Sequence, residues 1–190
     1  MSHLDAARWN ERYLTQARSI TDQPRDFLIE QAHHLPARGL ALDAAMGLGA
    51  NAAFLIERGL DVIGVDVSEV AARQARARQP RLMAAVIDLD RARWPDRAFD
   101  VILNFYFLSR PLFSQYRHLL RPGGVLIGES LLQETVIYRP DFNPDFLLAP
   151  GELRALCAGL DILVYREGWI NRAGRHPRAV ASVVARRTNR

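Results

Sequence analysis

The sequence contains no lysine, and all 25 of its basic residues are arginine. Chemistry that needs a lysine amine, such as Schiff-base formation, is therefore excluded. Cysteine is almost as scarce, because Cys157 stands alone in the chain. A single cysteine forms neither an internal disulfide nor a cysteine metal cluster, so we expect no bound metal and a cytoplasmic location.

Long apolar runs are missing as well. No segment approaches the roughly 20 apolar residues of a membrane-spanning helix, and the N-terminus lacks the apolar core of a signal peptide. We therefore expect no membrane partner. The 190 residues, 49% hydrophobic and 24% charged, predict a single globular domain, residues 1–190, that acts as a monomer or homodimer.

The net charge of +4 raises the question of a nucleic-acid partner. Several arginines fall on the helix predicted over residues 68–78, where Ser68 provides the N-cap. No aromatic residues are interleaved with them, as nucleic-acid binding would favour. A solvated helix face explains these arginines better, and we expect no nucleic-acid partner.

The stretch 40–68 is the most informative part of the chain. It predicts a strand, a glycine-containing turn, a helix and a second strand that ends in an acid. Gly47 and Gly49 allow backbone conformations that a Cβ would block, and the helix beginning near Asn51 points unpaired N–H groups toward the same spot. Asp66, a strand-end acid that we expect to lie outside the core, can accept hydrogen bonds from both ribose hydroxyls of a nucleotide.

The same turn also satisfies the dinucleotide pattern G-x-G-x-x-[GA]. Asp43 argues against NAD, because its carboxylate would repel a pyrophosphate but suits a cationic ligand. The chain is also too short for a second domain that would hold a hydride acceptor. The residues instead resemble the class I S-adenosylmethionine (SAM) methyltransferases, with the motif Leu42-Asp43-x-x-x-Gly47-x-Gly49 followed by Val65-Asp66-Val67-Ser68.

The resemblance implies an α/β fold, a three-layer sandwich around a doubly wound, mostly parallel seven-stranded sheet with an antiparallel C-terminal strand. The last two predicted strands, 161–169 and 178–185, fit that ending. Residues 37–190 would form the Rossmann-like core, and residues 1–36 would form a helical lid segment, with one helix over 24–34. The resemblance implies SAM as the cofactor and S-adenosylhomocysteine as the product. Arg121-Pro122-Gly123-Gly124 is expected to be a turn.

The N-terminal segment Trp9-x-x-Arg12-Tyr13 is similar to the tellurite-resistance-type branch of these enzymes. Its aromatic residues can close over a small ligand while Arg12 pairs with a carboxylate; the alternative is a lid that only packs on the core. The chain departs from that branch at Leu48 and Ala50. It departs from the wider family at Ala45, where glycine is usual.

The ends of the third and fourth strands complete the implied cofactor site. The resemblance places adenine at Asp88 and Leu89, and the methionine part of SAM at Asn104 and Phe105; we expect Phe107 to pack in the core. The full expected cofactor set is Trp9, Arg12, Tyr13, Asp43, Gly47, Gly49, Asn51, Asp66, Val67, Asp88, Leu89, Asn104 and Phe105.

The methyl group of SAM is already activated, so the main task of such an enzyme is in-line placement of the nucleophile. Tyr106, Glu129 and His176 are the candidate catalytic residues; Glu129 and His176 could act as a general base or only make a structural hydrogen bond. The stretch 139–144 reads as a mobile flap. We expect a methyltransferase of small molecules or inorganic anions (thiols, tellurite or selenite). The alternative is a non-catalytic SAM-binding protein.

Overall fold

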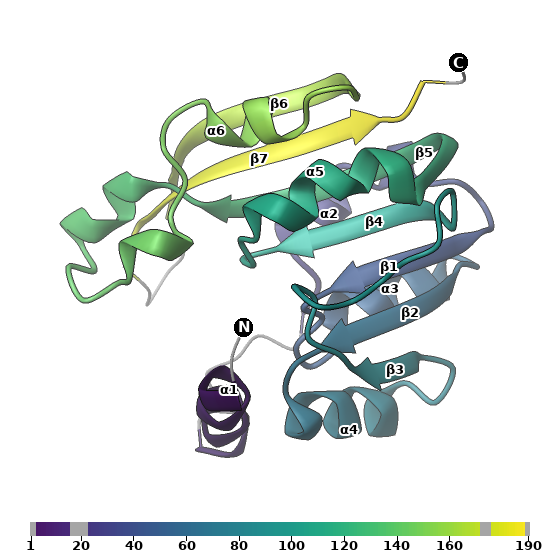
Figure 1. The fold of residues 1–190 in the computed structure, drawn as a ribbon, viewed down its shortest axis with the longest axis horizontal. Coiled ribbons are helices and arrows are strands. Elements are labelled where there is room, and N and C mark those ends of the chain that lie inside the picture. Colours follow the sequence, from purple (N-terminus) through teal and green to yellow (C-terminus); the bar gives the residue numbers. More distant parts are fainter. Residues whose placement is uncertain (1–2, 16–22, 172–175, 189–190) are drawn as a thin grey trace.

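The computed structural model describes residues 3–15, 23–171 and 176–188, and its centre is one seven-stranded sheet (Figure 1). The strand order is β3-β2-β1-β4-β5-β7-β6. Strands β1 to β5 pair in parallel, and β7 runs antiparallel to both of its neighbours. The predicted mostly parallel sheet with an antiparallel C-terminal strand is confirmed. The strands are β1 (Leu40–Ala44), β2 (Asp61–Asp66), β3 (Met83–Val86), β4 (Phe99–Phe105), β5 (Leu120–Leu131), β6 (Asp161–Ile170) and β7 (Arg178–Arg186).

Helices cover both faces of the sheet, because neighbouring residues of each strand point to opposite sides. Leu42 and Ile102 pack with α5 on one face, whereas Ala41 and Val101 pack with α2 and α3 on the other. This gives the three layers that the sequence predicts. The helices are α1 (His3–Thr15), α2 (Asp26–Glu30), α3 (Ala50–Glu57), α4 (Glu69–Arg78), α5 (Arg110–Leu119) and α6 (Glu152–Leu156), with short 3-10 helices η2 (Ala32–His34), η3 (Gln133–Ile137) and η4 (Pro144–Phe146).

Helix α1 lies beside α4 rather than on the sheet (Figure 1). The Ser68 hydroxyl caps α4 by accepting from the Ala71 N–H at 3.1 Å, and it donates to the side-chain oxygen of Asn10 at 2.6 Å. Tyr13 is buried against Leu48 in the glycine loop. These contacts fix the inner face of α1 beside the ends of β1 and β2.

Two sequence expectations about elements are wrong. The single helix expected over 24–34 breaks at Gln31 into α2 and η2, and Leu35 is extended, as a residue that precedes a proline prefers. The turn expected at residues 121–124 lies within β5, where the register with β4 shifts so that Leu120 pairs with Phe99 and Val125 with Val101. Within the part of the chain that the structure describes, no helix is long and apolar enough to cross a membrane.

Candidate functional site

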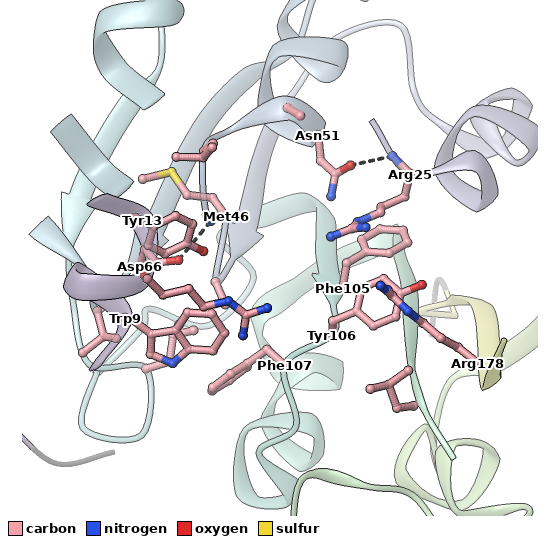
Figure 2. Close-up of a pocket in the computed structure, with 18 of the residues that line it drawn as sticks. Trp9, Tyr13, Arg25, Met46, Asn51, Asp66, Phe105, Tyr106, Phe107 and Arg178 are labelled. Carbon is pink, nitrogen blue, oxygen red and sulfur yellow. Dashed lines mark hydrogen bonds between the residues drawn. The ribbon is translucent and has the colours of Figure 1, made fainter. Parts of the chain in front are cut away.

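A cavity of about 490 Å³ opens at the ends of the neighbouring strands β1 and β4. After β1 the next strand of the chain, β2, lies on one side of this pair, and after β4 the next strand, β5, lies on the other side. This is the topological switch point, where open α/β sheets bind their ligands. Figure 2 shows Trp9, Tyr13 and Asp66 on one side of the cavity and Arg25, Tyr106 and Arg178 on the other. The cavity volume is typical of a small-molecule site.

The turn after β1 places its backbone against this cavity. Gly47 and Gly49 adopt left-handed conformations with φ of 56° and 77°, as the sequence expectation requires. A Cβ on Gly47 would lie 2.8 Å from the Tyr13 hydroxyl, so only glycine lets α1 pack this closely. Ala45 is also left-handed, with φ of 57°. The usual family glycine at this position therefore has a conformational reason, and Ala45 carries the strain instead.

Asp66 is held rigidly at the end of β2. One carboxylate oxygen accepts from the Gly47 N–H and the other from the Ser68 N–H, both at 2.9 Å. The side chain is 5% exposed, which corrects the expectation that it lies outside the core. Burial raises the pKa of Asp66, and these backbone hydrogen bonds oppose that shift. The Val67 N–H is a third backbone donor to this carboxylate, and the acceptor capacity that remains faces the cavity.

Helix α1 forms one wall of the cavity with Trp9, Arg12 and Tyr13. The two aromatic rings are 5.8 Å apart, and the Arg12 guanidinium lies 5.0 Å from the centre of the Trp9 ring. Burial, followed by the nearby charge of Asp66, raises the pKa of Tyr13, which keeps its hydroxyl protonated as a donor. The predicted N-terminal group is thus assembled at the cavity.

Two predicted cofactor residues, Asp43 and Asn104, are buried behind the residues that line the cavity. Asp43 is 1% exposed, and within the described ranges its Oδ2 has no hydrogen-bond partner. Burial raises the pKa of Asp43 to about 7. Asn104 donates to the Tyr116 hydroxyl at 2.9 Å, whereas its Oδ1 likewise lacks a described partner. Neither residue lines the cavity, so any influence on a ligand passes through charge or an intermediate group.

Tyr106 organises the opposite side of the cavity. Its φ of 60° is a strained conformation for a non-glycine residue. The Tyr106 hydroxyl donates to Glu129 at 2.6 Å, and the other Glu129 carboxylate oxygen accepts from Ser182 at 2.7 Å. Burial, reinforced by the charge of Glu129, raises the pKa of Tyr106. Glu129 does not reach the cavity, so it positions Tyr106 instead of facing a substrate.

The remaining predicted residues divide between the cavity and its surroundings. Gly49 stays outside, and Asp88 turns to the backbone of Asp90 and to Arg91. Residues 172–175 of the loop before His176, which include Gly174 and Arg175, lie outside the described residues. The predicted residues that do line the cavity are Trp9, Arg12, Tyr13, Gly47, Asn51, Asp66, Val67, Leu89, Phe105, Tyr106 and His176.

Several lining residues escaped the sequence analysis. Phe107 packs on the edge of the core, as expected, and it also lines the cavity. The flap expected at 139–144 contributes Arg139 and Phe142 to the wall. Arg25 is positioned by its own backbone N–H, which donates to the Asn51 side chain at 2.9 Å (Figure 2). No short motif marks these residues, because they come together only through the fold.

Known proteins resemble the chain in the same region. The protein-family model described as Methyltransferase domain matches residues 41–124, which hold the glycine turn and Asp66. The fold is shared with solved SAM-dependent methyltransferases. A SAM-dependent methyltransferase from Methanosarcina mazei superposes with a TM-score of 0.72 at 16% identity, over 88% of this chain and 100% of that one.

TehB from Haemophilus influenzae has the same fold, with a TM-score of 0.75 at 17% identity over 94% of this chain and 67% of TehB. Trans-aconitate 2-methyltransferase from Methylobacterium radiotolerans is 36% identical over 128 residues, which are 63% of this chain and 48% of that enzyme. The chain thus spans about half the length of this curated relative. The family model therefore indicates a methyltransferase domain over residues 41–124, and the solved structures show the same fold.

Proposed function

We propose that this chain is a SAM-dependent methyltransferase that acts on a small molecule. The observation that carries the proposal is the Asp66 carboxylate, locked between the glycine turn and α4 with its remaining lone pairs at a switch-point cavity. That arrangement suits the two ribose hydroxyls of a nucleoside. The matching family model and folds support the same cofactor.

The residues present fit SAM at three points. Val67 and Leu89 give apolar surface for the adenine next to Asp66. Arg12 and Arg25 offer guanidinium groups for the cofactor carboxylate. Asp43 is buried behind the turn, and its Oδ2 has no partner among the described residues, which favours a ligand that carries positive charge. When bound, SAM would supply a methyl group already activated by its sulfonium.

The chain's own contribution is placement. The aromatic wall of Trp9, Phe105 and Phe107 excludes water, and Tyr106 is fixed by Glu129. Positioning and loss of bulk water can supply most of the acceleration of such a transfer. The segment 1–36 is proposed to act as the lid of the core formed by residues 37–190, through α1 and through Arg25, which precedes α2.

The acceptor class is the finer part of the proposal. The Trp9-x-x-Arg12-Tyr13 segment, which resembles the tellurite-resistance-type branch, favours thiols, tellurite or selenite as acceptors. The relative's name adds trans-aconitate as an acceptor to try. A non-catalytic SAM-binding protein is the alternative, favoured by the strained Ala45 and by the position of Glu129 outside the cavity.

Ligand-induced stabilisation tests the cofactor. At about 100 times its Kd, SAM or S-adenosylhomocysteine should stabilise the fold by about 2.7 kcal/mol, which raises Tm by roughly 5–10 °C for a chain of this size. NAD at the same concentration should leave Tm unchanged, and equal stabilisation by NAD would overturn the assignment. Transfer of label from methyl-labelled SAM to any acceptor then separates the enzyme from the non-catalytic alternative.

A further inference from the structure

Strand β6 forms an open edge of the sheet. It comes last in the strand order, and Figure 1 shows it as the outermost strand. It pairs with β7 along one side, and among the described residues no backbone hydrogen bond joins its other side to another segment. A strand in this position presents a row of N–H and C=O groups to any further strand that approaches.

This edge is long, and its sequence does little to protect it. Strand β6 runs over ten residues, whereas β3 at the opposite edge has only four. Natural proteins protect such edges with proline, lysine or a bulge. Strand β6 contains neither proline nor lysine. Its pairing with β7 shifts register between Ile162 and Val164, which leaves the strand regular from Val164 onward.

The charged residues near the middle of β6 are paired within the chain. The Arg166 guanidinium donates two hydrogen bonds to the Glu30 carboxylate, at 3.0 Å and 2.8 Å. Glu167 accepts from the Tyr165 hydroxyl and from the Gly151 N–H. Because each charge has an internal partner, its repulsion of an approaching strand is weakened.

Exposed apolar side chains gather along the same edge. Leu163 and Trp169 on β6 are 39% and 44% exposed. The Trp169 ring meets the Tyr138 ring edge-on at 5.5 Å, and Val136 and Ile137 precede Tyr138 with exposed side chains of their own. Five of the nine large apolar residues that are exposed in the described part of the chain belong to this group. Apolar surface gathered in this way marks an interaction site.

The spacing of residues along β6 fits a second copy of the chain. Leu163 and Trp169 stand three residues before and three residues after Arg166. Antiparallel pairing of two β6 strands about a two-fold axis at Arg166 places Leu163 opposite Trp169 of the partner subunit, and the symmetric contact forms at the same time. Tyr165 then lies opposite Glu167 of the partner subunit, a hydroxyl donor against a carboxylate. The two Arg166 side chains meet at the axis, each already paired with a carboxylate of its own chain.

We propose that β6 is the interface of a homodimer, in which two copies pair antiparallel about Arg166 and their sheets join into one. The proposal goes beyond the methyl-transfer activity and does not depend on it. Thr135 and Arg139, on either side of the exposed segment 136–138, line the cavity. A partner subunit that packs on this segment would therefore stand behind one wall of the cavity.

Sedimentation equilibrium over a range of protein concentrations tests the interface. The wild type should reach twice the mass of the chain. Leu163→Lys and Trp169→Glu should each raise the dissociation constant of the dimer about a hundredfold, because each substitution acts twice across the axis. Both positions are exposed, so the variants should keep the circular dichroism spectrum of the wild type. Met83→Lys is the matched control, since Met83 is 48% exposed on the opposite edge strand, and it should leave the dimer intact.

Mixing the two disrupted variants tests the register. Only in a mixed dimer do the introduced ammonium and carboxylate face each other, while the second contact keeps the wild-type pair. The mixture should therefore dimerise under conditions where neither variant does so alone. A wild type that stays monomeric at every concentration would overturn the proposal and leave the edge open to a different protein. A dimer that survives Leu163→Lys or Trp169→Glu, or a mixture that stays monomeric, would overturn it as well.

Discussion

Replacing Asp43 by asparagine should remove much of the pH dependence of stability. The pKa of this buried carboxyl is raised from 3.8 to about 7, chiefly by desolvation. The folded protein therefore keeps a proton up to about pH 7 that the unfolded chain loses near pH 4. Between these values unfolding releases a proton, so the free energy of unfolding falls as pH rises.

The size of the effect follows from the shift. A pKa difference of about three units corresponds to about 4 kcal/mol in total, and the part between pH 5 and pH 7 is about 3 kcal/mol. Wild-type protein should lose about that much more stability than Asp43→Asn between pH 5 and pH 8, as measured by urea unfolding at each pH. Asparagine has nearly the same shape but does not titrate. Parallel stability curves for the two proteins would refute the reasoning.

A cationic ligand should reverse the preference of Asp43 for its neutral form. Because a nearby positive charge favours the carboxylate, SAM affinity should rise as pH increases through about 7 in the wild type. Asp43→Asn should bind SAM more weakly at pH 8 and with little pH dependence. Calorimetric titrations at pH 6 and pH 8 measure both effects, and a wild-type affinity that does not vary with pH would place the cation away from Asp43.

Two further substitutions and one deletion probe other parts of the site. Asp66→Ala should weaken SAM binding by about one to two decades in Kd. It should also lower Tm, because the N–H groups of Gly47 and Ser68 lose their acceptor, and an unchanged Kd would place the ribose elsewhere. Ala45→Gly should relieve the left-handed strain and stabilise the fold by about 1 kcal/mol in urea unfolding, whereas a loss of stability would contradict the argument. Deletion of residues 1–14 should leave a folded core with reduced SAM affinity and turnover, and unaltered kinetics would show that α1 only packs on the core.

The sequence predicts the first half of the sheet well because local signals agree there. The glycines of the turn, the Ser68 cap and the acid at the end of β2 each act over a few residues, and each appears where expected. The shifted register of residues 121–124 depends on pairing with the distant strand β4. Local patterns carry no information on such contacts.

The same distinction applies to the site. Asp66 and Gly47 belong to one motif, so the sequence places them together. Arg25 and Arg178 are separated by most of the chain, and only the sheet order brings both to Tyr106. The burial of Glu129 is equally invisible locally, since its partner Ser182 sits on the neighbouring antiparallel strand.

Ser68 connects helix α1 to the nucleoside site through hydrogen bonds. Its N–H holds Asp66, its hydroxyl caps α4, and the same hydroxyl donates to Asn10 on α1. Undocking α1 would leave this hydroxyl without its acceptor at the place where Asp66 is anchored. By thermodynamic reciprocity, a ligand that binds Asp66 more tightly when α1 is docked must favour docking by the same factor. Ligand binding at the nucleoside site and docking of the N-terminal helix would then be coupled, so that measuring either one gives information on the other.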